Sequence, residues 1–146
     1  MKIKIIEDPD LEEDIIIHCR VMTPEIQKFV DQSSTMSIQA SSRGSDVNVD
    51  LNNVLFFETE GDAVYVHLNN RSLITRYRLY ELEDALPSTF MRISKSTILN
   101  SENVSSLERN LTSNRSVQFF DSTKIVYVSR MYYSKLKTKL KERSIL

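Results

Sequence analysis

Short runs of alternating apolar and polar residues, separated by turn-forming residues, constrain this fold more than any other feature. They recur from residue 36 to residue 128. Alternation buries one face of a strand and exposes the other, and short connections join neighbouring strands in antiparallel pairs. The pattern therefore predicts a mostly antiparallel β domain with short helices. Hairpins are expected over residues 36–49, 64–77 and 116–128, a strand over residues 54–58, and a strand, turn and strand over residues 98–107.

Two short helices are predicted within and after these strands. Residues 79–86 carry three leucines at helical spacing, and Pro87 ends that pattern. Ser129 can cap a last helix over residues 130–140. The inner side of that helix should carry Tyr133, Leu136 and Leu140. Six apolar residues from the strands and their surroundings are expected in the core: Phe56, Phe57, Phe90, Leu99, Val104 and Val126.

The residues ahead of the β domain predict a small ββα arm. Residues 2–6 and 14–21 are rich in isoleucine, which favours two strands joined by an acidic loop that contains proline. Thr23 then provides an N-cap and Pro24 the first position of a short helix. Its apolar face consists of Ile26, Phe29 and Val30. Cys19, the single cysteine, is expected to be a small buried hydrophobe rather than a reactive thiol.

The sequence offers little material for an enzyme or a metal site. Gly44 and Gly61 are the only glycines, which excludes the glycine-rich loops that cradle nucleotide phosphates. His18 and His67 lie in strand-like runs without a metal-binding or triad motif around them. The carboxylates of residues 7–14 are expected to form a solvent-exposed turn, with binding of a divalent cation as the alternative. No catalytic residue, metal site, cofactor or small-molecule substrate is therefore predicted.

Two further protein classes are excluded by the strand pattern and the apolar runs. The start KIKIIEDPD is similar to the opening of a phosphoacceptor receiver domain, which needs a parallel sheet with alternating helices. The antiparallel pattern begins by residue 36, so a complete receiver is excluded. The longest aliphatic run, residues 15–17, is far shorter than the roughly 20 residues that span a bilayer, and no signal-peptide pattern is present. A cytoplasmic protein is expected.

Charge is distributed unevenly along the chain. Residues 1–31 and residues 32–87 each hold eight acidic and four basic residues, whereas residues 88–146 hold four acidic and eleven basic residues. The last segment therefore has a net charge of +7. It should attract a polyanion that the rest of the chain repels. A solvated helix face would by itself be a simpler explanation of the basic run at residues 136–143.

Four motifs follow one another along the chain. A strand with an acid at its end leads into a hairpin, and a helix that carries leucines follows. An F-x-R-x-x-[RKN]-S-x-x-x-N segment comes next, and V-S-R precedes a basic helix. The segments are VLFFETEGDAVYVHL, LYELEDAL, FMRISKSTILNSENVSSL and KIVYVSRMYYSKLKTKL. Together they resemble the LytTR family of bacterial DNA-binding domains, over about residues 36–142.

The resemblance implies a fold and three contact positions. The fold would be an elongated stack of small antiparallel β-sheets whose loops, rather than a recognition helix, enter successive major grooves. Lys95, in the polar cluster at residues 92–96, falls at a contacting position, Asp62 lies near a second contacting loop, and Arg130 supplies the third contact. Asp62 departs from the family pattern, because phosphate repels an acid and only a base amine such as cytosine N4 could donate to it. Lys95 lacks the planar fork of arginine.

The residue types at the start of the last helix support the same interpretation independently. Ser129 and Arg130 begin a helix whose backbone amides favour a phosphate, while the arginine can reach a guanine edge. The candidate DNA-binding residues are Asp62, Arg92, Ser94, Lys95, Ser96, Ser129, Arg130, Tyr132, Lys135 and Lys137.

The predicted function is sequence-specific binding of double-stranded DNA and transcriptional regulation. Residues 36–146 would form the DNA-binding domain, and residues 1–35 the arm, which would contact a second copy of the chain or another protein. Without a receiver, the chain resembles the stand-alone family members, which are often controlled by a membrane protein encoded beside them. The alternative is a protein-interaction module that acts through the acidic arm.

Overall fold

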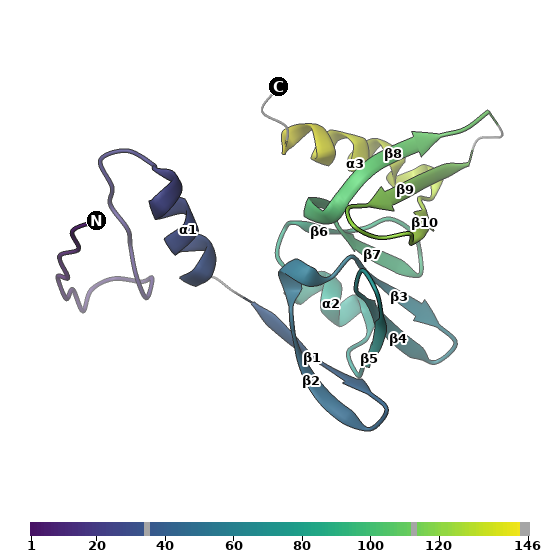
Figure 1. Ribbon diagram of the computed structural model, residues 1–146, viewed down its shortest axis with the longest axis horizontal. Coiled ribbons are helices and arrows are strands. Elements are labelled where there is room, and N and C mark those ends of the chain that lie inside the picture. The colour runs from purple at the N-terminus through teal and green to yellow at the C-terminus, as the bar shows by residue number, and fades with distance from the viewer. Residues whose placement is uncertain (34–35, 112–113, 144–146) are drawn as a thin grey trace. The chain divides into compact units, whose positions relative to one another are not determined.

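The computed structural model describes residues 1–33, 36–111 and 114–143. The chain divides into two compact units, Met1–Ser34 and Thr35–Leu146. In Figure 1 the first unit consists of an extended segment and the helix α1, and the second unit contains the β-strands with the helices α2 and α3.

The first unit contains the helix α1 (Pro24–Ser33). Thr23 Oγ1 accepts the backbone N–H of Ile26 at 3.2 Å, which confirms the predicted start of this helix. The strands predicted over residues 2–6 and 14–21 do not form, so that prediction was wrong. Two strands alone are marginal in water unless a third strand or a helix packs on them. This unit supplies no such packing, because the isoleucines of both runs are exposed.

The predicted burial of Cys19 was also wrong. Its thiol lies on an exposed segment of the first unit. A unit of this length cannot enclose a core by itself, and much of its apolar surface remains in contact with solvent. The exposed apolar residues of this unit include Ile3, Ile5, Ile6, Leu11, Ile15, Ile16, Ile17, Val21, Met22 and Phe29.

The second unit is built on a seven-stranded antiparallel sheet with the order β2-β1-β5-β4-β3-β7-β6. This sheet confirms the predicted antiparallel fold class. The turn between β1 and β2 consists of Arg43 and Gly44, whose φ angles of 50° and 80° suit a tight hairpin. The seven strands are β1 (Ser37–Ser42), β2 (Ser45–Asp50), β3 (Phe56–Glu60), β4 (Ala63–His67), β5 (Ser72–Thr75), β6 (Phe90–Arg92) and β7 (Thr97–Asn100).

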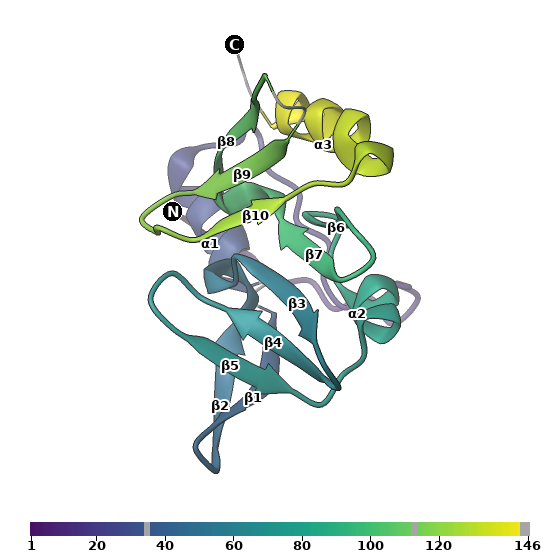
Figure 2. The same ribbon diagram turned by 90° about the vertical axis from the view of Figure 1, so that its right-hand side faces the viewer.

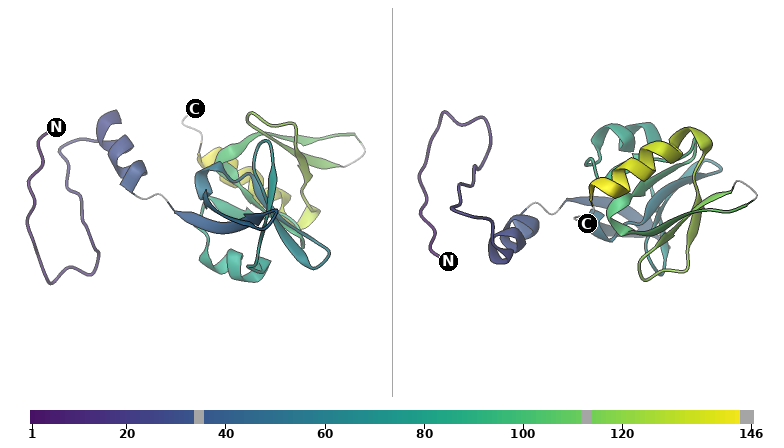
Figure 3. Two further views of the ribbon diagram at one scale, coloured as in Figure 1. Left: turned by 60° about the horizontal axis from the view of Figure 1, so that its bottom comes forward. Right: turned by 90° about the horizontal axis from the view of Figure 1, so that it is seen from above.

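A second sheet has three antiparallel strands in the order β10-β9-β8. Its strands are β8 (Val104–Arg109), β9 (Arg115–Phe119) and β10 (Ile125–Tyr127). The helix α3 (Arg130–Glu142) follows β10 and runs alongside this sheet (Figure 3). The helix α2 (Leu79–Ala85) packs near β3, β6 and β7. Two short 3-10 helices, η1 (Leu51–Asn53) and η2 (Ser101–Asn103), complete the described elements.

Strands β3 and β7 separate two hydrophobic cores. Phe57 and Ile98 belong to the core that includes the leucines of α2. Phe56 and Leu99 belong to the core that the three-stranded sheet and α3 complete, with Leu136 fully buried there. Because successive strand residues point to opposite faces, these two strands need consecutive apolar residues. All six residues predicted for the core are buried, so that prediction is confirmed.

A polar joint connects the two sheets. Lys124, just before β10, donates from Nζ to Arg71 O at 3.0 Å and to Ser72 Oγ at 3.2 Å. Its Nζ also lies 3.3 Å from His67 Nδ1. The His67 ring stacks on Phe56, with 4.2 Å between ring centroids. Burial and the nearby Lys124 ammonium lower the pKa of His67 to about 4, so the imidazole is neutral near pH 7.

Candidate nucleic-acid interface

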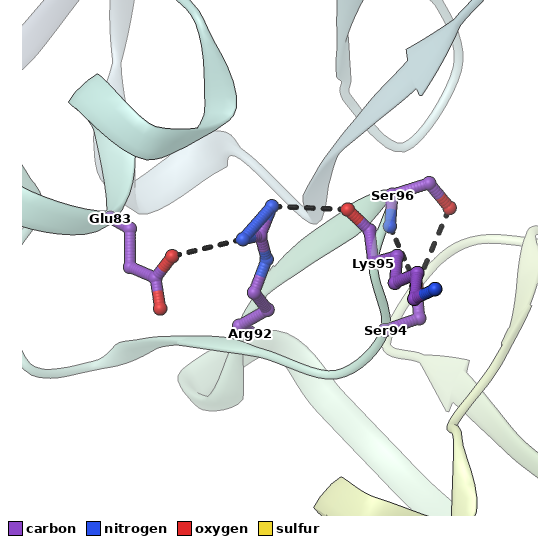
Figure 4. Close-up of polar contacts among 5 residues, drawn as sticks. All are labelled: Glu83, Arg92, Ser94, Lys95 and Ser96. Carbon is purple, nitrogen blue, oxygen red and sulfur yellow. Dashed lines mark hydrogen bonds and ion pairs between the residues drawn. The ribbon is translucent and has the colours of Figure 1, made fainter.

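The connection between β6 and β7 forms a tight loop, shown in close-up in Figure 4. Ile93 is fully buried, and its backbone N–H donates to Thr97 O at 3.0 Å, which closes the base of the loop. Near the tip, Ser94 Oγ accepts the backbone N–H of Ser96 at 3.3 Å, a local turn that serine favours. Lys95 is exposed between the two serines. The core therefore holds the base of a loop that presents a lysine and two hydroxyl groups.

The Arg92 guanidinium braces this loop. Its Nη1 forms an ion pair with Glu83 Oε2 of α2 at 3.1 Å, and its Nη2 donates to Lys95 O at 3.0 Å (Figure 4). The Arg92 side chain is only 21% exposed. An arginine with two partners and little exposure is well placed to hold the loop against α2.

The start of α3 lies directly beside the same loop. The backbone N–H of Ser129 donates to Ile93 O at 2.9 Å. Ser129 occupies the N-cap position, but its side chain makes no capping hydrogen bond, so the predicted side-chain cap was wrong. Leu136, which is fully buried, anchors the helix, and Arg130 at its first position is exposed. Arg130 and Lys95 are therefore exposed side chains on two segments that a backbone hydrogen bond joins.

The turn between β3 and β4 lies on the other side of the loop. The backbone N–H of Thr59 donates to Ser96 O at 2.8 Å. Gly61, with φ of +61°, and the exposed Asp62 then form the two-residue turn. Arg78, just ahead of α2, donates from Nη1 to Asp62 O at 3.0 Å. The turn is thus linked both to the β6–β7 loop and to the segment before α2.

These contacts place several of the predicted residues along one edge of the second unit. In Figure 2, the start of α3, the β6–β7 loop, α2 and the β3–β4 turn follow one another down the right-hand side. Asp62, the loop residues 92–96, Ser129 and Arg130 share this edge. Tyr132 is half-buried and packs against the core beneath α3. Lys135 and Lys137 are exposed further along that helix.

Charge changes sign along this edge. The α3 end is strongly basic, since residues 130–143 hold six basic residues and one acidic residue. The opposite end combines Glu60, Asp62 and Glu81 with Arg76 and Arg78. A duplex that follows the edge would therefore be attracted more strongly to α3 than to the β3–β4 turn.

Arg78 was not among the residues that the sequence singled out. Its side chain reaches the turn of Asp62 from the segment before α2. Sixteen positions separate the two residues along the chain, so no local motif marks them as neighbours. Its sequence position before a leucine-bearing helix indicates only a helix boundary.

The acidic run at residues 7–14, for which a cation site was the alternative prediction, is exposed throughout. Asp8 Oδ1 accepts the backbone N–H of Asp10 at 3.1 Å within an exposed turn. Across residues 1–33, 36–111 and 114–143, no group of three or more histidine, cysteine, aspartate or glutamate side chains is placed to hold a metal ion. In the same part of the chain, no helix has both the length and the apolar character needed to cross a membrane.

Known proteins share both the sequence pattern and the fold. The family model of the LytTr DNA-binding domain matches residues 44–141. An HTH-type transcriptional regulator of Staphylococcus aureus strain MSSA476 is 29% identical over 148 residues, covering 96% of this chain and 98% of the relative. Another, from strain MRSA252, is 32% identical over 97 residues, covering 62% of this chain and 65% of the relative.

A solved structure is similar to this chain in fold. It is the LytTr DNA-binding domain of a methyl-accepting/DNA response regulator from Bacillus cereus. The match has a TM-score of 0.64 at 22% sequence identity, and it covers 71% of this chain and 95% of that chain. At this level of identity the likeness establishes the fold.

Proposed function

This chain belongs to the LytTR family of DNA-binding domains, and from that premise we propose that it binds a specific duplex sequence and thereby regulates transcription in the cytoplasm. The hydrogen bond between Ser129 N–H and Ile93 O carries this proposal. It fixes the first turn of α3 against the β6–β7 loop. Lys95 and Arg130 can then enter one major groove together, because neither has to order its segment on binding.

The residues of this edge have different roles. Arg130 and Lys95 are exposed donors that can reach base edges, where arginine pairs bidentately with guanine. Ser94 and Ser96 present hydroxyl groups that suit phosphate oxygens. Arg92 is a positioning residue, because Glu83 and the loop carbonyl already occupy its guanidinium.

The exposed lysines of α3 supply affinity without sequence information. Lys135 and Lys137 neutralise phosphates, since every phosphate presents the same oxygens. Ser129 contributes through its position at the start of the helix, where the helix dipole favours an anion. Tyr132 supports α3 from below, because its ring packs against the core.

The proposal is tested in two steps. Selection from a pool of random duplexes should first enrich a recurring sequence. Fluorescence anisotropy with that duplex and a scrambled one should then show that Lys95→Ala and Arg130→Ala bind the selected duplex more weakly. Arg43→Ala, at the tip of the β1–β2 hairpin far from α3 in Figure 2, is the matched control and should bind as the original protein does. A pool that yields no recurring sequence would refute specific recognition.

The first unit has a separate proposed role as a protein contact. Its exposed isoleucines form an apolar surface on a segment whose net charge is −4 over residues 1–31. Apolar surface of this kind marks protein interaction sites, and the charge keeps the segment away from DNA. We propose that it binds a second copy of the chain or a regulatory protein, and a membrane-bound regulator is one candidate.

Salt dependence distinguishes the main proposal from a module that acts only through this first unit. Binding through about six phosphates should weaken by on the order of 10³-fold between 50 and 200 mM salt. A mainly apolar protein interface should change little over that range. If duplex DNA binds with no salt dependence, the phosphate contacts proposed here are absent.

A further inference from the structure

The β3–β4 turn combines a location suited to DNA contact with an unsuitable side chain. The turn lies next to the β6–β7 loop, because Thr59 N–H donates to Ser96 O at 2.8 Å. Its exposed residues Glu60 and Asp62 are both acidic. A phosphate that approaches this end of the edge would be repelled unless a nearby cation compensates for the two carboxylates.

Arg78 is held at that position from both sides. Its backbone N–H donates to Glu81 Oε1 at 3.0 Å at the start of α2, and its Nη1 donates to Asp62 O at 3.0 Å. The guanidinium is therefore fixed on the carbonyl of the turn although the residue belongs to another segment. Arginine has five N–H donors in a planar fork, so one bond to a carbonyl leaves donors for a second acceptor.

Comparison with Arg92 separates a contacting arginine from a supporting one. Both guanidinium groups donate to a loop carbonyl, of Lys95 for Arg92 and of Asp62 for Arg78. Arg92 is mostly buried and paired with Glu83. Arg78 is exposed, and among the residues that the structure describes no carboxylate forms an ion pair with it. The charge of Arg78 is therefore available to a ligand in solvent.

We propose that Arg78 is the residue through which the β3–β4 turn contacts DNA, and that its ligand is a backbone phosphate. This inference rests on the proposed DNA-binding function and extends the contact edge beyond the β6–β7 loop. Arg78 takes the place of a basic residue in the turn itself, and Asp62 orients it through its backbone carbonyl. The side-chain carboxylate of Asp62 opposes the same phosphate.

Salt titrations of full-length variants test this role. Arg78→Gln should weaken binding to the selected and scrambled duplexes by the same factor, because a phosphate carries no sequence information. The slope of log K against log salt should become shallower by about 0.9, the value for one lost phosphate contact. Arg78→Lys should keep most of the slope. Arg43→Gln removes the same charge at the β1–β2 turn and should leave the slope unchanged.

Asp62→Asn provides a second measurement that does not disturb the turn backbone. Removal of the carboxylate should strengthen binding to both duplexes, and the gain should shrink as salt increases. Unchanged binding would refute the opposing role of Asp62. If Arg78→Gln loses affinity at an unchanged salt slope and also unfolds at a lower temperature, Arg78 only supports the turn and the proposal is wrong.

The outcomes also distinguish this inference from the function on which it rests. If the unmodified protein binds no duplex in a salt-dependent way, the proposed function itself fails. If the unmodified protein binds and Arg78→Gln titrates exactly as Arg43→Gln does, only the role of Arg78 fails. A loss confined to the selected duplex would also overturn the proposal, because it would assign Arg78 to a base edge.

Discussion

An arginine on the proposed DNA-facing edge can support the protein fold or contact the nucleic acid, and its burial and partners distinguish these roles. Arg92 has a carboxylate and a carbonyl for its guanidinium and is mostly buried. Arg130 is exposed at the first position of α3. Replacement of Arg92 and replacement of Arg130 are therefore expected to impair DNA binding in different ways.

Arg130 and Lys137 should differ in the information that they contribute. Arg130→Ala should cost about 1–3 kcal/mol at the selected duplex and relax the preference at one base pair. Lys137→Ala should weaken the selected and scrambled duplexes together and reduce the salt slope by about one unit. Titration of both variants against both duplexes at two salt concentrations measures the contrast. If Arg130→Ala lowers the affinity for both duplexes equally, Arg130 contacts the phosphate backbone of the DNA and not a base edge.

Arg92→Lys should weaken DNA binding although the charge is retained. A lysine ammonium cannot contact both Glu83 and the Lys95 carbonyl as the planar guanidinium of arginine does. The β6–β7 loop should therefore lose its attachment to α2. The salt slope should stay unchanged, because no phosphate contact is removed. Anisotropy at several salt concentrations gives both quantities. Arg43→Lys at the β1–β2 turn is the matched exposed exchange and should have no effect. Wild-type affinity in Arg92→Lys would show that the contacts of Arg92 with Glu83 and the Lys95 carbonyl are dispensable.

Among the larger elements, the joint between the two sheets lies on the segment that leads into α3. Lys124 precedes β10, and β10 leads through Val128 and Ser129 into α3. The contacts of Lys124 with His67, Ser72 and the Arg71 carbonyl attach this segment to the β4–β5 hairpin. A polar contact outside the proposed DNA-contacting edge therefore holds the segment that leads to Arg130.

This joint predicts a specific dependence of stability on pH. The pKa of His67 falls from 6.5 to about 4 in the folded protein, so protonation favours the unfolded chain. The neutral His67 side chain contributes its full stabilisation of the folded state above pH 6.5. This contribution declines as the pH falls from 6.5 toward 4, because the unfolded chain then binds the proton more readily. Thermal unfolding of the original protein and of His67→Gln at pH 7, 5.5 and 4.5 should show a difference that narrows with falling pH. A difference independent of pH would contradict the neutral state of His67.

At the scale of the whole molecule, the proposed DNA recognition and the proposed association belong to separate units. The proposed DNA-facing edge lies within Thr35–Leu146, and the exposed isoleucines of residues 3–17 lie within Met1–Ser34. The relatives are called HTH-type regulators. In this chain, however, the described residues place five strands between α2 and α3, so these two helices do not form consecutive members of a helix-turn-helix.

Removal of residues 1–35 should leave the affinity for a single DNA site nearly intact and change the assembly state. The proposed DNA contacts all lie in the second unit, whereas the first unit is acidic over residues 1–31. Sedimentation and anisotropy on the full and shortened chains measure the two properties. As a control, Ile15→Ser and Ile16→Ser in the full chain should alter assembly in the same direction. A large loss of affinity in a folded shortened chain would assign the first unit to DNA binding.

The sequence by itself determined the features that depend on near neighbours. Period-two alternation identified the antiparallel hairpins, and Phe56, Phe57 and Leu99 were expected in the core, where they are buried. Thr23 and Pro24 identified the start of α1. The same local signals failed at residues 2–6 and 14–21, because a strand forms only where another element pairs with it.

Only the tertiary structure decided which polar groups meet. Arg92 joins Glu83 across nine positions, Arg78 joins Asp62 across sixteen, and Lys124 reaches His67 across fifty-seven. No local pattern encodes such pairs, since their geometry depends on how the strands are ordered in the sheets and how both cores are filled. For this reason the sequence could identify Arg92 as part of a polar cluster, but only its burial between α2 and the loop separated its supporting role from the exposed position of Arg78.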